Sequence, residues 1–214
     1  KKKIKVIEDA AEALGTFNEY NKHAGTTGDY GVLSFNANKV ITSASGGALF
    51  VKKNTDFLKA KKLIAQSKVN PVFFTHDDMG FNYGMSNIHA AIGLGQFEKI
   101  KKILKKKEKI FLQYKKNFTG ENKFEFGTFN KNSKPNYWLN YIILKKNFRY
   151  NYLKSIINNL IKEGIQVRPL WYPCHKQNHL KFFKSVNIKN ANHIYKQVVC
   201  LPSSHFLKIK EINY

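Results

Sequence analysis

The hydrophobic pattern of the first fifty residues predicts short strands separated by turns. Apolar residues dominate the runs 4–9, 30–35 and 48–51, which are bounded by glycine and polar residues. Apolar runs of this length with such boundaries are typical of strands in a sheet. The Ala-rich stretch 10–14, followed by Gly15, favours the start of a helix after the first strand. A strand, a helix and further strands in this order predict an α/β fold.

Helical spacing replaces the strand pattern in the middle of the chain. A helix is predicted from Asn54 or Thr55, either of which can cap it, to about Gln66. A longer helix is predicted after Ser86, because apolar residues recur every three or four positions over several turns. The basic run 101–109 interleaves with these apolar positions, so most of its charges belong to the solvent face of that helix.

A second, smaller α/β unit is predicted to begin near residue 118. Its elements mix strands and helices, as expected for a small domain packed on a larger one. The predicted elements are strands at 124–129, 137–144 and 165–171, a helix from Asn151 to Gly164, and short helical pieces near Leu180 and at 191–199. We therefore predict two domains, residues 1–117 and residues 118–214.

The strong positive charge of the chain does not by itself indicate a nucleic-acid site. The formal net charge is +23, yet Arg149 and Arg168 are the only arginines among 37 basic residues. Polyanion-binding faces usually carry clustered arginine, because the guanidinium matches phosphates and base edges. We predict no specific nucleic-acid function, and a basic polyanion-binding module is the least favoured alternative. No apolar stretch approaches the roughly 20 residues that cross a bilayer, so we expect a cytoplasmic protein without a membrane span.

The spacing of cysteine and histidine residues predicts no metal site. Cys174 and Cys200 lack the paired spacing of zinc or redox motifs, so we interpret them as reduced, structural thiols. His175 and His179 are four residues apart, but no glutamate follows His175 and no third ligand lies nearby in the sequence.

Candidate chemistry gathers around Lys39, which lies in the turn between the second and third predicted strands. This turn, from Ser34 to Gly47, is rich in serine and glycine. Asp9 ends the first predicted strand, and open α/β sheets bind ligands at the carboxyl ends of their strands. Pyridoxal phosphate requires an amine for a Schiff base, a carboxylate for its pyridine nitrogen, and hydroxyl or N–H groups for its phosphate. Lys39 also fits a solvated surface lysine and Asp9 a helix N-cap, so both interpretations stay open.

Four motifs in this order resemble the sugar aminotransferases of the DegT/DnrJ/EryC1 family, which are fold-type-I enzymes that use pyridoxal phosphate. The motifs occupy residues 6–15, 34–39, 80–83 and 168–171, and the resemblance runs over almost the whole chain. The resemblance implies part of a large cofactor-binding domain, built on a mostly parallel sheet with flanking helices, followed by a small C-terminal α/β domain. It also implies that the first part of the large domain is absent from this chain.

The resemblance implies two catalytic residues and three further cofactor contacts. Lys39 would form the Schiff base and then move a proton between the amino donor and the cofactor, and Asp9 would keep the pyridine nitrogen protonated. Glu12 would lie near the ring hydroxyl of the cofactor, and Ser34 would bind its phosphate. Asn82 would reach the cofactor phosphate of the partner subunit in a homodimer.

The resemblance also implies substrate contacts and a reaction. Arg168, Trp171 and His175 would approach the substrate from the small domain, and Gly84 stands where the family commonly has arginine. The implied reaction moves an amino group from glutamate to a nucleotide-linked 4-keto-6-deoxy sugar for surface glycans. One alternative is a non-catalytic remnant that cannot hold the cofactor. Family dehydratases work without an anchoring lysine, and the presence of Lys39 disfavours that activity.

Overall fold

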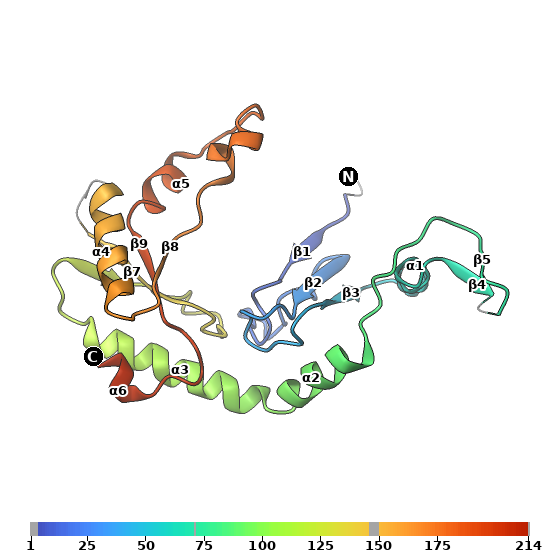
Figure 1. Cartoon of the computed structure of the whole chain (residues 1–214), viewed down its shortest axis with the longest axis horizontal. Helices are drawn as coiled ribbons and strands as arrows, with labels where there is room; N and C mark the ends of the chain where they lie inside the picture. The colour runs from blue at the N-terminus through green and yellow to red at the C-terminus, as the bar shows by residue number, and fades with distance from the viewer. Residues whose placement is uncertain (1–3, 71, 146–149, 214) are drawn as a thin grey trace. The chain divides into compact units, whose positions relative to one another are not determined.

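Helices and short strands are mixed along the chain, which confirms the predicted α/β class (Figure 1). The computed structural model describes residues 4–70, 72–145 and 150–213. Within these ranges, no helix has both the length and the apolar character needed to span a membrane. The chain forms two compact units. Unit 1 consists of Lys1–Leu104 and Asn130–Trp138, and unit 2 consists of Lys105–Phe129 and Leu139–Tyr214.

The sheet of unit 1 contains β1 (Ile7–Asp9), β2 (Tyr30–Ser34) and β3 (Gly47–Val51). β1 lies parallel to β2, and Asp9 pairs with Val32. β3 is antiparallel to β2, so the described part of the predicted mostly parallel sheet has one parallel and one antiparallel pair. Because β1 and β2 run in the same direction, their carboxyl ends lie at the same edge of the sheet.

The helix predicted after β1 is wrong, because residues 10–14 form turns. The side chain of Asn136 binds two carbonyl oxygens of this stretch. Its Nδ2 donates to Glu12 O at 2.8 Å and to Leu14 O at 3.0 Å. Gly15 then adopts a φ of +83°, in the left-handed region that glycine tolerates. A tertiary contact therefore fixes a conformation that the local sequence does not reveal.

Glu8 ties the connection between β1 and β2 to the sheet. Its carboxylate accepts hydrogen bonds from the backbone N–H groups of Gly25 at 2.8 Å, Thr27 at 2.6 Å and Gly28. Desolvation of this side chain opposes its ionisation, but the three N–H donors outweigh that effect and lower the pKa of Glu8. The loop passes β2 so closely that a Cβ on Gly31 would lie 1.8 Å from Gly25 O, so only glycine fits there.

A helix and a short hairpin follow the sheet of unit 1. The helix is α1 (Asn54–Ile64), and the hairpin consists of β4 (Lys68–Asn70) and β5 (Thr75–His76). α1 lies in the predicted place, but the predicted cap is wrong. Its N-cap residue is Lys53, whose side chain makes no capping hydrogen bond.

The long helix predicted after Ser86 is two helices, α2 (Asn87–Phe97) and α3 (Ile100–Asn117). The predicted cap is confirmed, because Ser86 Oγ accepts a backbone N–H from the first turn of α2. The prediction of one continuous helix is wrong at the junction. There the N–H of Lys99 donates to Gln96 O, three residues back, so a tight turn interrupts the helical pattern.

The core of unit 1 lies directly behind the lysine-bearing turn. Val40 and Ile41, which follow Lys39, are 4% and 3% exposed and form a buried cluster with Ile103. Burial of apolar side chains stabilises the turn that carries the lysine. Partly buried residues packed against this cluster are Leu14, Phe35, Ile100, Leu104 and Trp138.

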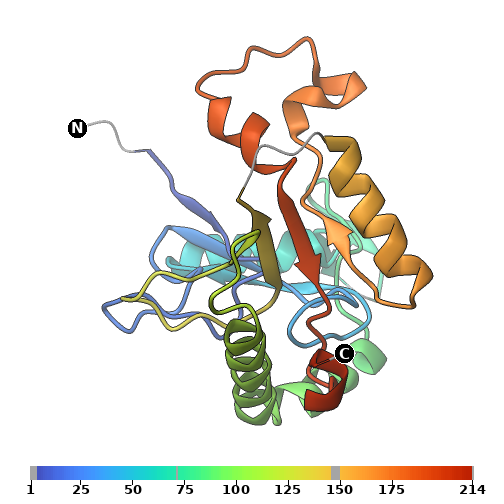
Figure 2. The same cartoon turned by 90° about the vertical axis from the view of Figure 1, so that its left-hand side faces the viewer.

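Unit 2 contains a four-stranded antiparallel sheet and helices that contact it. The strand order is β6 (Phe124–Phe126), β7 (Asn140–Leu144), β9 (Val198–Leu201) and β8 (Arg168–Pro169). The prediction of a helix up to residue 199 is wrong at its end. Its last residues belong to β9, an inner strand whose four residues are all buried. α4 (Tyr150–Lys162) contacts β8 (Figure 2) and ends before Gly164, as predicted.

The segment after β9 is bound to α3. Lys107 Nζ donates to Ser203 O at 2.7 Å, and the hydroxyl of Tyr114 donates to Pro202 O at 3.1 Å. These bonds fix the C-terminal part of unit 2 on the helix. The short helices of this unit are η1 (Cys174–Lys176), η2 (Asn178–Leu180), α5 (Lys189–Ile194) and α6 (Ile209–Ile212).

Candidate functional site

Lys39 lies in a turn that closes just beyond β2, and its side chain is 13% exposed. The backbone N–H of Lys39 donates to Asn36 O at 3.0 Å and closes this turn. The buried residues Val40 and Ile41 then anchor the chain on its far side. This lysine is therefore not a solvated surface residue, although most of the lysines that the structure describes are exposed.

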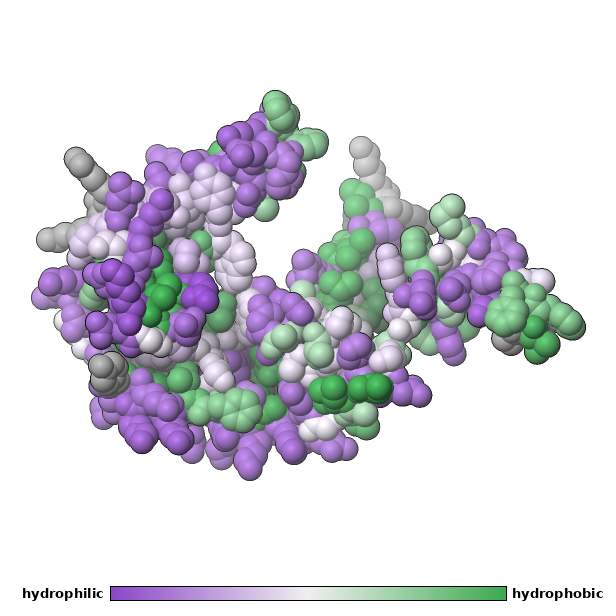
Figure 3. All heavy atoms as spheres, viewed as in Figure 1, coloured by the Kyte–Doolittle hydropathy of each residue, from purple (hydrophilic) through white to green (hydrophobic). Residues whose placement is uncertain are grey.

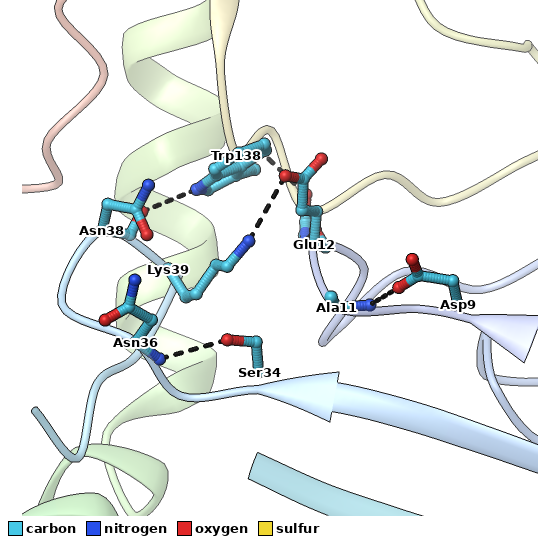
Figure 4. Close-up of polar contacts among 9 residues, drawn as sticks. Asp9, Ala11, Glu12, Ser34, Asn36, Asn38, Lys39 and Trp138 are labelled. Carbon is cyan, nitrogen blue, oxygen red and sulfur yellow. Dashed lines mark hydrogen bonds and ion pairs between the residues drawn. The ribbon is translucent and has the colours of Figure 1, made fainter. Parts of the chain in front are cut away.

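Within the described part of the chain, the amine of Lys39 contacts Glu12 and Trp138 (Figure 4). Nζ lies 3.3 Å from Glu12 Oε1 and 4.7 Å from the centre of the Trp138 ring. A carboxylate and an aromatic face both attract an ammonium group. The structure thus brings Lys39 and Glu12 together as two of the predicted site residues, and it adds Trp138 to them.

Asp9 and Ser34 are the last residues of the parallel strands β1 and β2, so they lie at the same edge of the sheet. Asp9 Oδ1 accepts a hydrogen bond from Ala11 N at 3.2 Å, and no donor among residues 4–70, 72–145 and 150–213 contacts Oδ2. Because no helix follows β1, the N-cap interpretation of Asp9 is wrong. Ser34 Oγ accepts the N–H of Asn36 at 3.3 Å (Figure 4).

The donor set of this edge fits pyridoxal phosphate. Lys39 supplies an amine, Asp9 a carboxylate oxygen without another partner among the residues that the structure describes, and Ser34 a hydroxyl next to the lysine-bearing turn. These are the three groups that hold the carbonyl carbon, the ring nitrogen and the phosphate of this cofactor. The catalytic and binding roles of these residues stay predictions.

The other predicted site residues lie outside this group of contacts. Asn82 forms a backbone bridge with Ala65 in unit 1. In unit 2, Arg168 donates to Val167 O at 2.7 Å, and His175 Nε2 lies 2.9 Å from Asn192 Oδ1. Trp171 is 61% exposed. The proposed contacts of these residues with a partner subunit or a substrate stay predictions.

Sequence reasoning missed the residues that support the lysine from far along the chain. Trp138 and Asn136 lie about a hundred residues after Lys39, and no local spacing links them to it. Glu8 lies in the predicted first strand, and its carboxylate also accepts hydrogen bonds from three backbone N–H groups of the loop before β2. The one available signal was its place beside Asp9 at the end of a predicted strand.

Comparison with known proteins links this geometry to a family. The model of the DegT/DnrJ/EryC1/StrS aminotransferase family matches residues 1–214. EpsN of Bacillus subtilis, named as a candidate pyridoxal phosphate-dependent aminotransferase, is 34% identical over 94% of this chain and 52% of its own length. GDP-perosamine synthase of Vibrio cholerae is 38% identical over 79% of this chain and 46% of its own length. The chain spans about half the length of the curated relatives it matches.

A solved structure gives the same result for the fold. Helicobacter pylori PseC, an aminotransferase involved in the biosynthesis of pseudoaminic acid, is 26% identical with a TM-score of 0.90. The match covers 98% of this chain and 57% of PseC. This confirms that the chain has part of a fold-type-I aminotransferase fold, and aminotransferases of this type use pyridoxal phosphate. Sequence, fold and the donor set around Lys39 agree, and the chain belongs to the DegT/DnrJ/EryC1/StrS aminotransferase family.

Proposed function

We propose that this chain carries the lysine-bearing part of a sugar aminotransferase. The enzyme moves an amino group from glutamate to a nucleotide-linked 4-keto-6-deoxy sugar in the cytoplasm, for surface glycans. The observation that carries the proposal is the placement of Asp9 and Ser34 at the carboxyl ends of two parallel strands, next to the partly shielded amine of Lys39. The names of the relatives, which include GDP-perosamine synthase, support a nucleotide-linked sugar as the acceptor.

Each residue of the site has a role that follows from its chemistry. Pyridoxal phosphate, when bound, supplies an electron-withdrawing ring that stabilises negative charge on the carbon next to the transferred nitrogen. Lys39 would hold the cofactor through its carbonyl carbon, and its Nζ would move a proton during transfer of the amino group. Asp9 holds the proton of the pyridine nitrogen, and Ser34 Oγ binds the phosphate. Glu12 would contact the hydroxyl group of the cofactor ring and so orient that ring.

Three residues of unit 2 are proposed to bind the substrate. Arg168 offers a guanidinium, which suits the carboxylate of the amino donor or a phosphate of the nucleotide. His175 offers a ring nitrogen that now lies beside the side chain of Asn192. Trp171 is largely exposed and offers a flat apolar face, which suits a sugar or a base.

A homodimer is the proposed assembly, with Asn82 directed to the cofactor phosphate of the other subunit. The exposed apolar surface of α2 supports it. This helix is mostly apolar, yet none of its residues is buried, and Ile88 and Leu94 are 75% and 59% exposed. Figure 3 shows apolar side chains at the surface of the face that carries α2. Helices of this composition are normally covered by protein.

An amination assay tests the proposed reaction. The chain is incubated with pyridoxal phosphate, ¹⁵N-glutamate and GDP-, UDP- or dTDP-linked 4-keto-6-deoxy sugars, and the products are analysed by mass spectrometry. The proposal predicts a ¹⁵N-amino sugar and 2-oxoglutarate, and Lys39→Arg should form neither because its side chain cannot form the Schiff base. A folded chain that binds the cofactor but forms no product with any of these acceptors would contradict the proposed function, and a folded chain that does not bind the cofactor would favour the non-catalytic remnant.

A further inference from the structure

The segment 130–138 joins unit 1 although the chain on both sides of it belongs to unit 2. It is fixed to the stretch after β1 by a pair of backbone hydrogen bonds. Phe17 N donates to Lys134 O at 3.0 Å, and Lys134 N donates to Phe17 O at 2.9 Å. Two residues further on, the Asn136 side chain binds the carbonyl oxygens of Glu12 and Leu14. The segment therefore has a fixed position beside the residues that surround Lys39.

The turn at residues 136–138 holds the indole of Trp138 in one orientation. Asn136 is 5% exposed, and its Oδ1 accepts the backbone N–H of Trp138 at 2.9 Å. Tyr137 between them has a φ of +51°, a left-handed conformation that is unfavourable for a bulky residue. Such backbone conformations persist where surrounding contacts impose them, and they concentrate at functional sites.

Trp138 contacts the lysine-bearing turn in two ways. Its Nε1–H donates to Asn38 O at 2.8 Å, which fixes the backbone next to Lys39. Its ring lies 4.7 Å from Lys39 Nζ, within the range of a cation–π interaction. Figure 4 shows the ring on one side of the amine and Glu12 beside it. One indole therefore contacts both the backbone beside Lys39 and the amine of its side chain.

We propose that Trp138 is a positioning residue for Lys39. Its indole N–H fixes the turn, and its ring covers the amine and holds it beside the Glu12 carboxylate. The contacts that carry this inference belong to the chain itself, and its consequence for catalysis rests on the proposed aminotransferase function. In that reaction the Trp138 ring would restrict the directions in which the Lys39 amine can move while it transfers a proton.

Competitive labelling of lysines with a trace of acetic anhydride tests the proposal without cofactor. The variants are Trp138→Phe, which keeps a ring but loses the indole N–H, and Trp138→Leu, which loses both. Trp171→Leu is the matched control at the second tryptophan of the chain. Lys154, which lies 5.0 Å from the Tyr150 ring, serves as the internal reference because its surroundings do not change.

Trp138→Leu is expected to raise the labelling rate of Lys39 relative to Lys154 by about two- to fivefold, the size of a partly exposed cation–π interaction. Trp138→Phe should stay within about a factor of two of the parent chain. Both variants should lower the melting temperature similarly, because both lose the bond to Asn38 O. Equal labelling of Lys39 in the parent chain and both variants would overturn the positioning role. An equal rise in both variants would overturn the role of the ring, because the loss that both variants share is that of the indole N–H.

Cofactor capture separates this proposal from the function on which it rests. Lys39 of the parent chain is tested for covalent capture of pyridoxal phosphate in parallel with the labelling. Protection of Lys39 by Trp138 without capture would support the positioning role and contradict the proposed function. Capture that is equally fast in the parent chain and in Trp138→Leu, with no change in labelling, would support the function and overturn the positioning role.

Discussion

Lys107 leads to a prediction about stability that depends on one buried amine. The residue is 5% exposed, and its Nζ donates to Ser203 O at 2.7 Å. Burial lowers the pKa of Lys107 from its ordinary value of 10.5 to about 8. One pKa unit corresponds to about 1.4 kcal/mol, so the charged amine lowers the free energy of unfolding by up to about 3 kcal/mol at neutral pH.

The sign of the pH dependence follows from the direction of the pKa shift. Between about pH 8 and pH 10.5 the folded chain has released the Lys107 proton, whereas the unfolded chain still binds it. The unfolded state then holds more protons, so the free energy of unfolding rises with pH across this range. Burial also raises the pKa of Tyr114 to about 12, which acts in the opposite direction, but only above that residue's ordinary pKa of 10.

Urea unfolding of the parent chain and of Lys107→Met between pH 7 and pH 10 measures this effect. The difference in the free energy of unfolding between the parent chain and Lys107→Met should change by about 2 kcal/mol over this pH range, because the variant lacks the titrating group. Lys106→Met, at an exposed position of the same helix, is the control and should follow the parent chain. A difference between the parent chain and Lys107→Met that stays constant within about 0.5 kcal/mol would refute the reasoning.

Three further substitutions test other parts of unit 1. Asn136→Ala leaves two backbone carbonyls without their donor and should lower the free energy of unfolding by about 2–3 kcal/mol in urea titrations; a loss under about 0.5 kcal/mol would contradict this role. Gly31→Ala places a Cβ against Gly25 O and should lower the melting temperature strongly, whereas Gly95→Ala, with open space in α2, should raise it slightly. Asp9→Asn should leave the melting temperature unchanged but weaken pyridoxal phosphate binding in a spectrophotometric titration; equal affinity would argue against its role at the pyridine nitrogen.

The parts of the site that the sequence predicts are those built from local pattern. The strands around Lys39 were predictable because apolar runs bounded by glycine have few other conformations, and Asp9 and Ser34 end two of them. The cap of α2 at Ser86 was predictable because capping depends on residues within one turn of the helix.

The parts that the sequence does not predict depend on contacts between distant segments. Residues 10–14 have helical composition, but the side chain of Asn136 binds their carbonyl oxygens and holds them in turns. Trp138 reaches the amine of Lys39 across about a hundred residues of chain. The last residues of the stretch 191–199 form a strand because β7 and β8 flank them, which no local preference indicates.

The central claim is that Lys39 is the amine that binds pyridoxal phosphate. The most direct test is an absorbance spectrum of the chain with this cofactor at moderate salt, followed by borohydride reduction and peptide mapping. We expect a visible absorption band and a reduced adduct on Lys39, both of which Lys39→Ala should lack. The absence of this band in a chain that is folded, as judged by circular dichroism, would contradict the role of Lys39. So would an adduct that is spread over other lysines to the same extent as in Lys39→Ala.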